Sequence, residues 1–183
     1  MSNCLCPITL TPVIRQCDSS NPGGVAEIYI ADKCSVDAIS APNETQVVTS
    51  ITMVSGATFN TFQQRKNVAN MTTTAAKDAT SGLATFSTDI NLKFNKLSAA
   101  SRLNFINLAK GETIVIVRLV DNSYWIIGSH NIPCELSAGT INSGTNLTDA
   151  SQYDVTLQCV DYNPPLKVEI LGGISTILDI YAV

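Results

Sequence analysis

Short segments in which apolar and polar residues alternate recur along most of the 183-residue chain, and they constrain the fold more than any other feature. Between Tyr153 and Cys159, for example, every second residue is apolar and the residues between them are polar. This period of two indicates a half-buried β-strand, because successive side chains of a strand point to opposite faces. About eight segments of the chain have strand character, by this alternation or by their content of β-branched residues.

Residues 98–110 are the exception, because their apolar residues follow the period of a helix. Ser98 is a suitable N-cap, and Leu103 and Ile106 share one face of the predicted helix. Gly111 follows at the position where a left-handed residue often ends a helix. One helix among about eight strands, without strand–helix–strand alternation, predicts a mainly β (α+β) fold. The expected architecture is an antiparallel β-sandwich or barrel with one flanking α-helix.

Turn-forming residues divide the chain into an arm and a single domain. The sequence Asn-Pro-Gly-Gly at 21–24 is a strong turn signal. Residues 1–24 are therefore interpreted as an N-terminal arm, and residues 25–183 as a β-sandwich domain. An insertion loop or hairpin is expected at about 55–85, since its central part, 67–82, is polar and has few large apolar side chains.

The remaining segments are assigned by composition. The run 112–120 is nearly all β-branched, which indicates burial on both faces, and 112–128 is expected to form a hairpin. The Gly-, Ser-, Thr- and Asn-rich segment 139–150 is expected to be an exposed loop. The other expected strands are 25–30, 45–54, 85–94, 132–138, 153–159 and 166–170.

The chain carries few charges for its length. Asp, Glu, Lys and Arg make up 14% of the residues, against roughly 25% in ordinary soluble domains, and the mean hydropathy is +0.18. No apolar run approaches the roughly 18–20 residues of a membrane-spanning helix, so no membrane span is expected. We therefore expect apolar surface to be buried against partner subunits. The net charge of −4 argues against a DNA-coating role, which requires cations to neutralise phosphates.

Residues with catalytic or metal-binding chemistry are scattered. His130, the only histidine of the sequence, has no nucleophile motif beside it and is expected to be an exposed turn residue. The cysteines at positions 4, 6, 17 and 34 lack the paired spacing of a structural zinc site, so free thiols are favoured over zinc. Cys134 and Cys159 fall in predicted strands and are expected in the core. No catalytic residue, cofactor or metal is predicted, and the chain is expected not to be an enzyme.

Four segments in the second half of the chain, taken together, carry a resemblance to a known class of proteins. They are Tyr-Trp-Ile-Ile-Gly at 124–128, Glu-Leu-Ser-Ala-Gly at 135–139, Ser-Gly-Thr-Asn-Leu-Thr-Asp at 143–149 and Tyr-Asp-Val-Thr-Leu at 153–157. Together with the order of polar insertion, strand, helix and apolar hairpin, they resemble the tail-tube fold of tailed bacteriophages. The resemblance extends over residues 45–170 and implies a β-sandwich flanked by one helix, with a long hairpin or loop that reaches a neighbouring subunit.

The resemblance further implies a structural virion protein that forms a homo-oligomeric ring with six-fold symmetry. Such rings stack into a tail tube or occur once as an adaptor or hub. The implied partners are copies of the chain itself and other phage tail proteins, with DNA passing only transiently through the lumen. The protein would be assembled in the host cytoplasm, in keeping with an N-terminus that has no recognisable signal peptide, and would be located in the virion tail. The expected subunit-interface residues are Asn67, Met71, Thr74, Lys77, Thr80, Ile174, Ile177 and Tyr181.

Two other classes of function stay open. A virion decoration protein, or a carbohydrate- or cell-surface-binding β-sandwich, would be expected to expose aromatic residues on loops. Aromatic residues make up only 6% of the chain, and the sole tryptophan, Trp125, lies in a predicted strand. A small tail-associated hydrolase would need a nucleophile motif or a pair of spaced carboxylates, and neither stands out.

Overall fold

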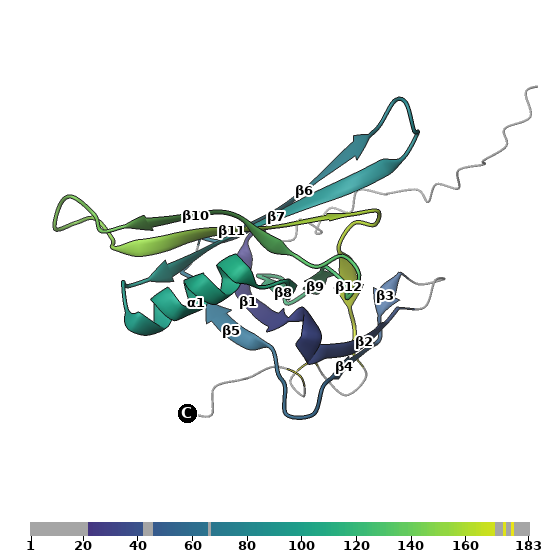
Figure 1. Ribbon diagram of the computed structural model, residues 1–183, viewed down its shortest axis with the longest axis horizontal. Coiled ribbons are helices and arrows are strands. Elements are labelled where there is room, and N and C mark those ends of the chain that lie inside the picture. Colours follow the sequence, from purple (N-terminus) through teal and green to yellow (C-terminus); the bar gives the residue numbers. More distant parts are fainter. Residues whose placement is uncertain (1–21, 42–45, 66, 171–173, 175–176, 178–183) are drawn as a thin grey trace, which may run out of the picture.

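Two β-sheets packed face to face form the body of the protein, in a computed structural model that describes residues 22–41, 46–65, 67–170, 174 and 177 (Figure 1). The six-stranded sheet contains, in spatial order, β3 (Val47–Val48), β12 (Leu166–Val168), β9 (Tyr124–Ile127), β8 (Thr113–Leu119), β1 (Val25–Asp32) and β5 (Asn60–Gln63). The four-stranded sheet contains β10 (Glu135–Asn142), β11 (Gln152–Asp161), β7 (Ala84–Asn95) and β6 (Asn70–Lys77). A third sheet pairs β2 (Val36–Ser40) with β4 (Ser50–Met53), and the helices are η1 (Lys33–Ser35) and α1 (Ala99–Lys110).

The predicted fold class is confirmed: the protein is mainly β, with several antiparallel sheets and one flanking α-helix. The strand pairs are antiparallel except β12 with β3, which run parallel. None of the helices in the described ranges combines the length and the apolar character that crossing a bilayer requires.

The first core lies between the six-stranded and the four-stranded sheets. Its fully buried side chains come from both sheets and include Ile28 and Ile30 of β1, Val115 and Val117 of β8, Ile90 and Leu92 of β7, and Val155 and Leu157 of β11. Cys134 and Cys159 belong to this core, as predicted. Because side chains alternate along a strand, β7 and β11 present their other face outward.

The second core lies on the opposite face of the six-stranded sheet. Tyr29, Ile114, Ile116 and Ile126 pack there against side chains of the two-stranded sheet and against Phe59. Strand β8 is therefore buried on both faces, as its β-branched composition predicts, and the hairpin with β9 is confirmed. This central strand contributes to both cores and joins the three layers of the protein.

Helix α1 begins where the sequence predicts but packs through a different face. The Ser98 hydroxyl accepts a hydrogen bond from the Ser101 backbone N–H at 3.1 Å, which confirms the N-cap. Leu103, assigned to the buried stripe, is 58% exposed. The helix instead packs through Phe105, whose ring lies 5.4 Å from that of Tyr153, and through the buried Leu108. The helix thereby covers part of β10 and β11 (Figure 1).

The end of α1 also differs from the prediction. Gly111 has an extended backbone with φ −97°, so it is not a left-handed cap. A Cβ at this position would lie 2.8 Å from the carbonyl oxygen of Asn107, which accepts a hydrogen bond from the Gly111 N–H. Glycine is therefore needed here for space and not for a positive φ.

Removal of the N-cap gives a first test of this description. Replacing Ser98 by Ala is expected to lower the free energy of unfolding by about 1 kcal/mol, because the hydroxyl that satisfies a helix N–H is lost. The control is Leu103→Ala on the exposed face, which is expected to change stability by less than about 0.5 kcal/mol. Urea denaturation measures both variants. Equal losses for the two would contradict the cap and the helix orientation.

Several predicted boundaries are wrong. Strand β5, placed in the insertion at 55–85, pairs with β1 in the six-stranded sheet, so the hairpin consists of β6 and β7 alone. The single strand expected at 45–54 is divided between β3 and β4, which belong to different sheets. The loop expected at 139–150 begins later, because β10 continues to Asn142. Most of the predicted arm, residues 1–21, lies outside the described residues.

Candidate assembly surface

No described element covers the outward face of the four-stranded sheet (Figure 1). We call it the outer face, and define it as the side chains of β6, β7, β10 and β11 that alternate with those of the first core. Its members in β7 and β11 include Asp89, Asn91, Lys93, Asp154, Thr156 and Gln158, and β6 and β10 add Asn70, Thr72, Thr74, Glu135 and Thr140. Most members of the face are therefore polar, with the exposed Val160 of β11 as an apolar exception.

Hydrogen bonds between side chains connect the strands of the outer face. Asn91 Nδ2 donates to Asn70 Oδ1 at 2.7 Å, and Asn91 Oδ1 accepts from the Thr156 hydroxyl at 2.7 Å, so one asparagine links three strands. Gln158 Nε2 donates to Asp89 Oδ1, also at 2.7 Å. Cross-strand polar pairs of this kind fix the side chains of a sheet face. The outer face is therefore an ordered polar surface and not a set of freely moving side chains.

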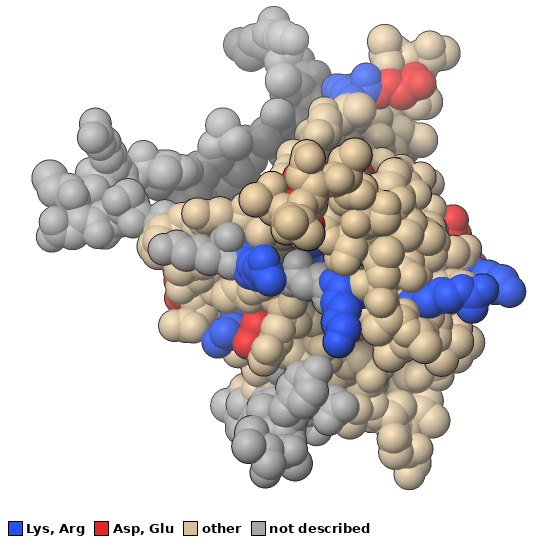
Figure 2. Space-filling model, turned by 90° about the vertical axis from the view of Figure 1, so that its left-hand side faces the viewer, with Lys and Arg blue, Asp and Glu red and all other residues tan. Residues whose placement is uncertain are grey.

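The outer face is more acidic than basic. Asp89, Glu135 and Asp154 are acidic members, and Lys93 forms an ion pair with Asp154 at 3.0 Å. The end of the molecule that Figure 2 shows is different, because Lys and Arg side chains are more prominent there than Asp and Glu. The outer face, with its excess of carboxylates, offers little attraction to the phosphates of nucleic acid.

The same sheet has two long open edges. Within the described residues, β6 pairs only with β7 and β10 pairs only with β11. Each of these edge strands has eight residues, whereas the edges of the six-stranded sheet, β3 and β5, have two and four. A long unpaired edge presents a row of backbone donors and acceptors and is a template for pairing with another chain.

The hairpin register identifies which backbone groups of β6 face its open edge. The Asp78 N–H donates to the Leu83 carbonyl at 2.9 Å, which makes Asp78 and Leu83 a hydrogen-bonded pair. Hydrogen-bonded and non-hydrogen-bonded pairs alternate along antiparallel strands. Ala75, three positions before Asp78 and opposite Phe86, is therefore in a non-hydrogen-bonded pair, and its N–H and C=O point to the open edge.

The turn of this hairpin is held by one carboxylate. Asp78 Oδ1 accepts hydrogen bonds from the backbone N–H groups of Ser81 at 2.7 Å and Thr80 at 2.6 Å. These bonds stabilise the ionised form and hold the pKa of Asp78 below its usual value. The turn thus has a defined shape although it projects away from both cores (Figure 1).

The predicted interface residues are distributed between this hairpin and the cores. Thr74, Lys77 and Thr80 are exposed on the hairpin, and Asn67 is exposed in the turn before it, with φ +61°. Met71 is half-buried and packs against the first core.

The C-terminal members of the prediction have a different setting. Ile177 is 8% exposed and belongs to the second core, and Ile174 packs against it. Both therefore contact the subunit's own interior. Tyr181 lies outside the described residues. The exposed members of the predicted interface therefore lie on or beside the hairpin, and Ile174 and Ile177 contribute to the second core.

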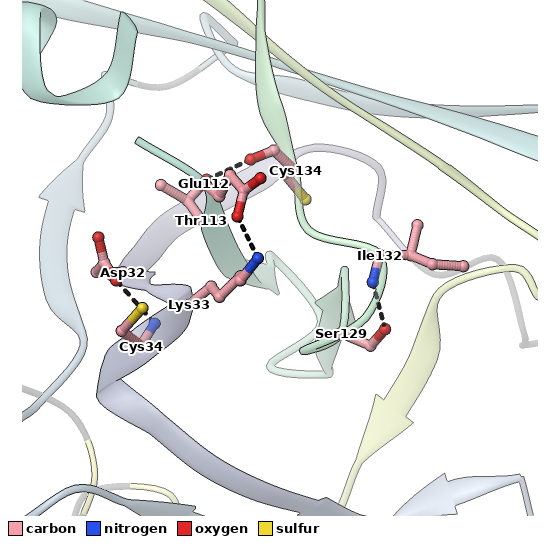
Figure 3. Close-up of polar contacts among 8 residues, drawn as sticks. All are labelled: Asp32, Lys33, Cys34, Glu112, Thr113, Ser129, Ile132 and Cys134. Atoms are coloured by element: carbon pink, nitrogen blue, oxygen red, sulfur yellow. Dashed lines mark hydrogen bonds and ion pairs between the residues drawn. The ribbon is translucent and has the colours of Figure 1, made fainter. Parts of the chain in front are cut away.

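A groove of about 930 Å³ lies between α1 and the edge strand β5. Amide and hydroxyl side chains dominate its wall, among them Asn60, Gln63, Ser101, Asn104 and Asn107. At the neighbouring end of β1, an ion pair between Lys33 and Glu112 joins η1 to the segment before β8 (Figure 3). The groove is polar and lies on the side of the protein away from the hairpin tip.

Residues singled out for catalysis or metal binding do not converge in the described part of the chain. His130 is exposed, as predicted, in a turn where Ser129 Oγ accepts from the Ile132 N–H at 3.1 Å (Figure 3). Among the described residues, no three His, Cys, Asp or Glu side chains are grouped to hold a metal ion. Cys34 is exposed, and the other cysteines weighed as zinc ligands, at positions 4, 6 and 17, lie outside the described residues.

Sequence reasoning did not identify the outer face or its open edges as a site. Its polar members are visible in the sequence as the residues that alternate with apolar ones in β7 and β11. No protein-family model, curated protein or solved structure matches the chain.

Proposed function

We propose that the chain is a structural subunit of a phage tail, and that copies of it join side by side through β6 and β10 to form a closed ring. The single observation that supports this most is the four-stranded sheet with two long open edges and an uncovered polar face. Ring closure would pair both edges of every subunit, which removes the hazard of uncontrolled edge-to-edge growth.

The order of the strands is compatible with such a junction. Neighbouring strands in the order β10, β11, β7 and β6 all run antiparallel, so β6 and β10 point in opposite directions. When β6 of one subunit lies beside β10 of the next, the antiparallel alternation continues without interruption. The contact joins two different edges of the subunit, and such a heterologous interface closes into a ring when its rotation allows.

In this arrangement the outer face would line the lumen. The first core and α1 lie behind the sheet, so the polar side chains are left to face the axis of the ring. Hydrogen-bonded Asn, Thr and Gln side chains with an excess of carboxylates would let DNA pass without binding tightly, because they do not neutralise phosphates. The proposal accounts for a conduit through which a genome is delivered.

The mass of the purified protein in solution tests the proposal. We expect mass photometry to show assemblies at a fixed multiple of the 19.5 kDa subunit, with six-fold rings as the expected species. Dilution distinguishes a specific ring from an aggregate. A closed ring dissociates into subunits and leaves two discrete masses, whereas an aggregate gives a continuous range of masses. A monomer of 19.5 kDa at every concentration, including those well above the micromolar range, would contradict the proposal.

A further inference from the structure

Two buried thiols face each other where β10 begins and β11 ends. The ladder of β10 and β11 pairs Leu136 with Leu157 and ends at Glu135 and Gln158, and Cys134 and Cys159 are the next residues beyond that last pair. The two leucines point into the first core, and the two cysteines, which are two positions away, share that face. Cys134 is 0% exposed and Cys159 is 3% exposed, and neither is in a disulfide.

The hydrogen bonds of the two thiols place both at the same turn, 127–132. Cys134 Sγ donates to the Ile127 carbonyl at 3.4 Å, and Cys159 Sγ donates to the Ile132 carbonyl at 3.7 Å, at the two ends of one tight turn. Gly128 lies between these ends, and a Cβ there would be 3.1 Å from Cys134 Sγ. A hydrogen bond with Cys159, together with burial, raises the pKa of Cys134.

We propose that Cys134 and Cys159 are a modification site, at which a reversible intrachain disulfide forms without rearrangement of the core. Directly opposite residues of antiparallel strands have Cα atoms about 4.5–5.5 Å apart, which lies within the 4.4–6.8 Å range of natural disulfides. Both side chains already point to the same face, so the bond needs only side-chain rotation. This inference does not depend on ring assembly.

A peroxide is the oxidant that the chemistry of the pair suits. The Cys159 thiol, whose pKa is lowered by its hydrogen bond with Cys134, attacks hydrogen peroxide and becomes a sulfenic acid, and one water is released. The Cys134 sulfur then attacks the sulfenic sulfur, and the hydroxyl leaves with the Cys134 proton as a second water. Two thiols and one peroxide thus give one disulfide and two waters. Reduction by an external thiol reverses the bond.

The disulfide would link two neighbouring segments of the four-stranded sheet at the point where this sheet meets the six-stranded sheet. Cys134 exchanges backbone hydrogen bonds of 2.7 and 2.9 Å with Thr113 of β8, and its carbonyl also accepts from the Thr113 hydroxyl at 3.1 Å (Figure 3). Cys159 lies on β11 of the four-stranded sheet. A bond between them would hold the residue before β10 against β11, next to its hydrogen bonds with β8. A protein that leaves a reducing compartment would gain stability in this way.

The spacing of basic residues makes the test direct. No Lys or Arg lies between Arg118 and Lys167, so trypsin leaves both cysteines in one peptide, 119–167, which contains no other cysteine. The full-length protein is treated with hydrogen peroxide or with a reductant, quenched with iodoacetamide under denaturing conditions, and digested. After oxidation we expect this peptide to be two hydrogens lighter and unalkylated. After reduction we expect two alkylated thiols.

Stability provides the second readout. The oxidised protein is expected to melt roughly 5–10 °C higher than the reduced protein, because the disulfide constrains the unfolded chain. The matched control Cys159→Ala should show no such shift. To avoid dependence on peroxide access to buried thiols, the wild-type chain is also refolded in a buffer of reduced and oxidised glutathione. The proposal fails if the refolded chain has a native circular-dichroism spectrum and peptide 119–167 still carries two free thiols. It also fails if the linked form has lost the native spectrum.

Discussion

Proline at position 75 is expected to abolish ring formation and to leave the subunit folded. Ala75 is exposed, and the register of the β6–β7 hairpin directs its N–H to the open edge. Proline removes this donor and places its ring where the neighbouring strand would approach, whereas the hydrogen bonds between β6 and β7 do not involve the Ala75 N–H. If β6 pairs with β10 of the next subunit, one such change in every subunit blocks every junction.

The matched control for this variant is Ala75→Thr. Threonine favours strands and retains the N–H, so assembly should equal that of the wild type. Circular dichroism and the midpoint of urea denaturation should place Ala75→Pro within about 1 kcal/mol of the wild type, since edge strands tolerate proline. Mass photometry then compares assembly. Full-size rings formed by folded Ala75→Pro protein would show that β6 is not part of the junction.

Truncation of Ile116 is expected to produce the largest loss of stability. Ile116 is fully buried in the second core on β8, the strand that contributes to both cores. Ile116→Ala is expected to lower the free energy of unfolding by about 2–5 kcal/mol, since buried methylene groups are lost and a cavity remains. That is a large share of the roughly 5–15 kcal/mol of a typical domain.

The exposed Leu147, in the loop after β10, serves as the control. Leu147→Ala removes the same class of side chain from a position that buries nothing, and it should change stability by less than about 0.5 kcal/mol. Urea denaturation of the reduced proteins compares the two. A loss below about 1 kcal/mol for Ile116→Ala would mean that the second core is not formed as described.

The elements that the sequence predicts well are those with a local signal. The alternation in β7 and β11 identifies both strands, and the Ser98 cap identifies the start of α1, because each depends on neighbouring residues alone. The face on which α1 packs, by contrast, does not depend on neighbouring residues alone. Two apolar stripes on the helix compete, one with Leu103 and one with Phe105 and Leu108, and the position of Tyr153 on β11 selects the second.

The missed features depend on partners that are distant in the sequence. The end of β10 is rich in Gly, Ser, Thr and Asn and has the composition of a loop, but pairing with β11 keeps it extended to Asn142. The open edges of the four-stranded sheet follow from the order of strands, which alternation does not specify. The proximity of Cys134 and Cys159 depends on the register between β10 and β11. A shift of this register by one residue would turn one of the two side chains to the other face of the sheet.

The proposed ring makes a clear prediction for electron microscopy of the purified wild-type protein. Class averages should show closed hollow rings of one size, and a reconstruction should place the outer face on the lumen, with β6 of each subunit beside β10 of the next. Monomers alone, or closed rings in which the outer face lies on the external surface, would contradict the proposal.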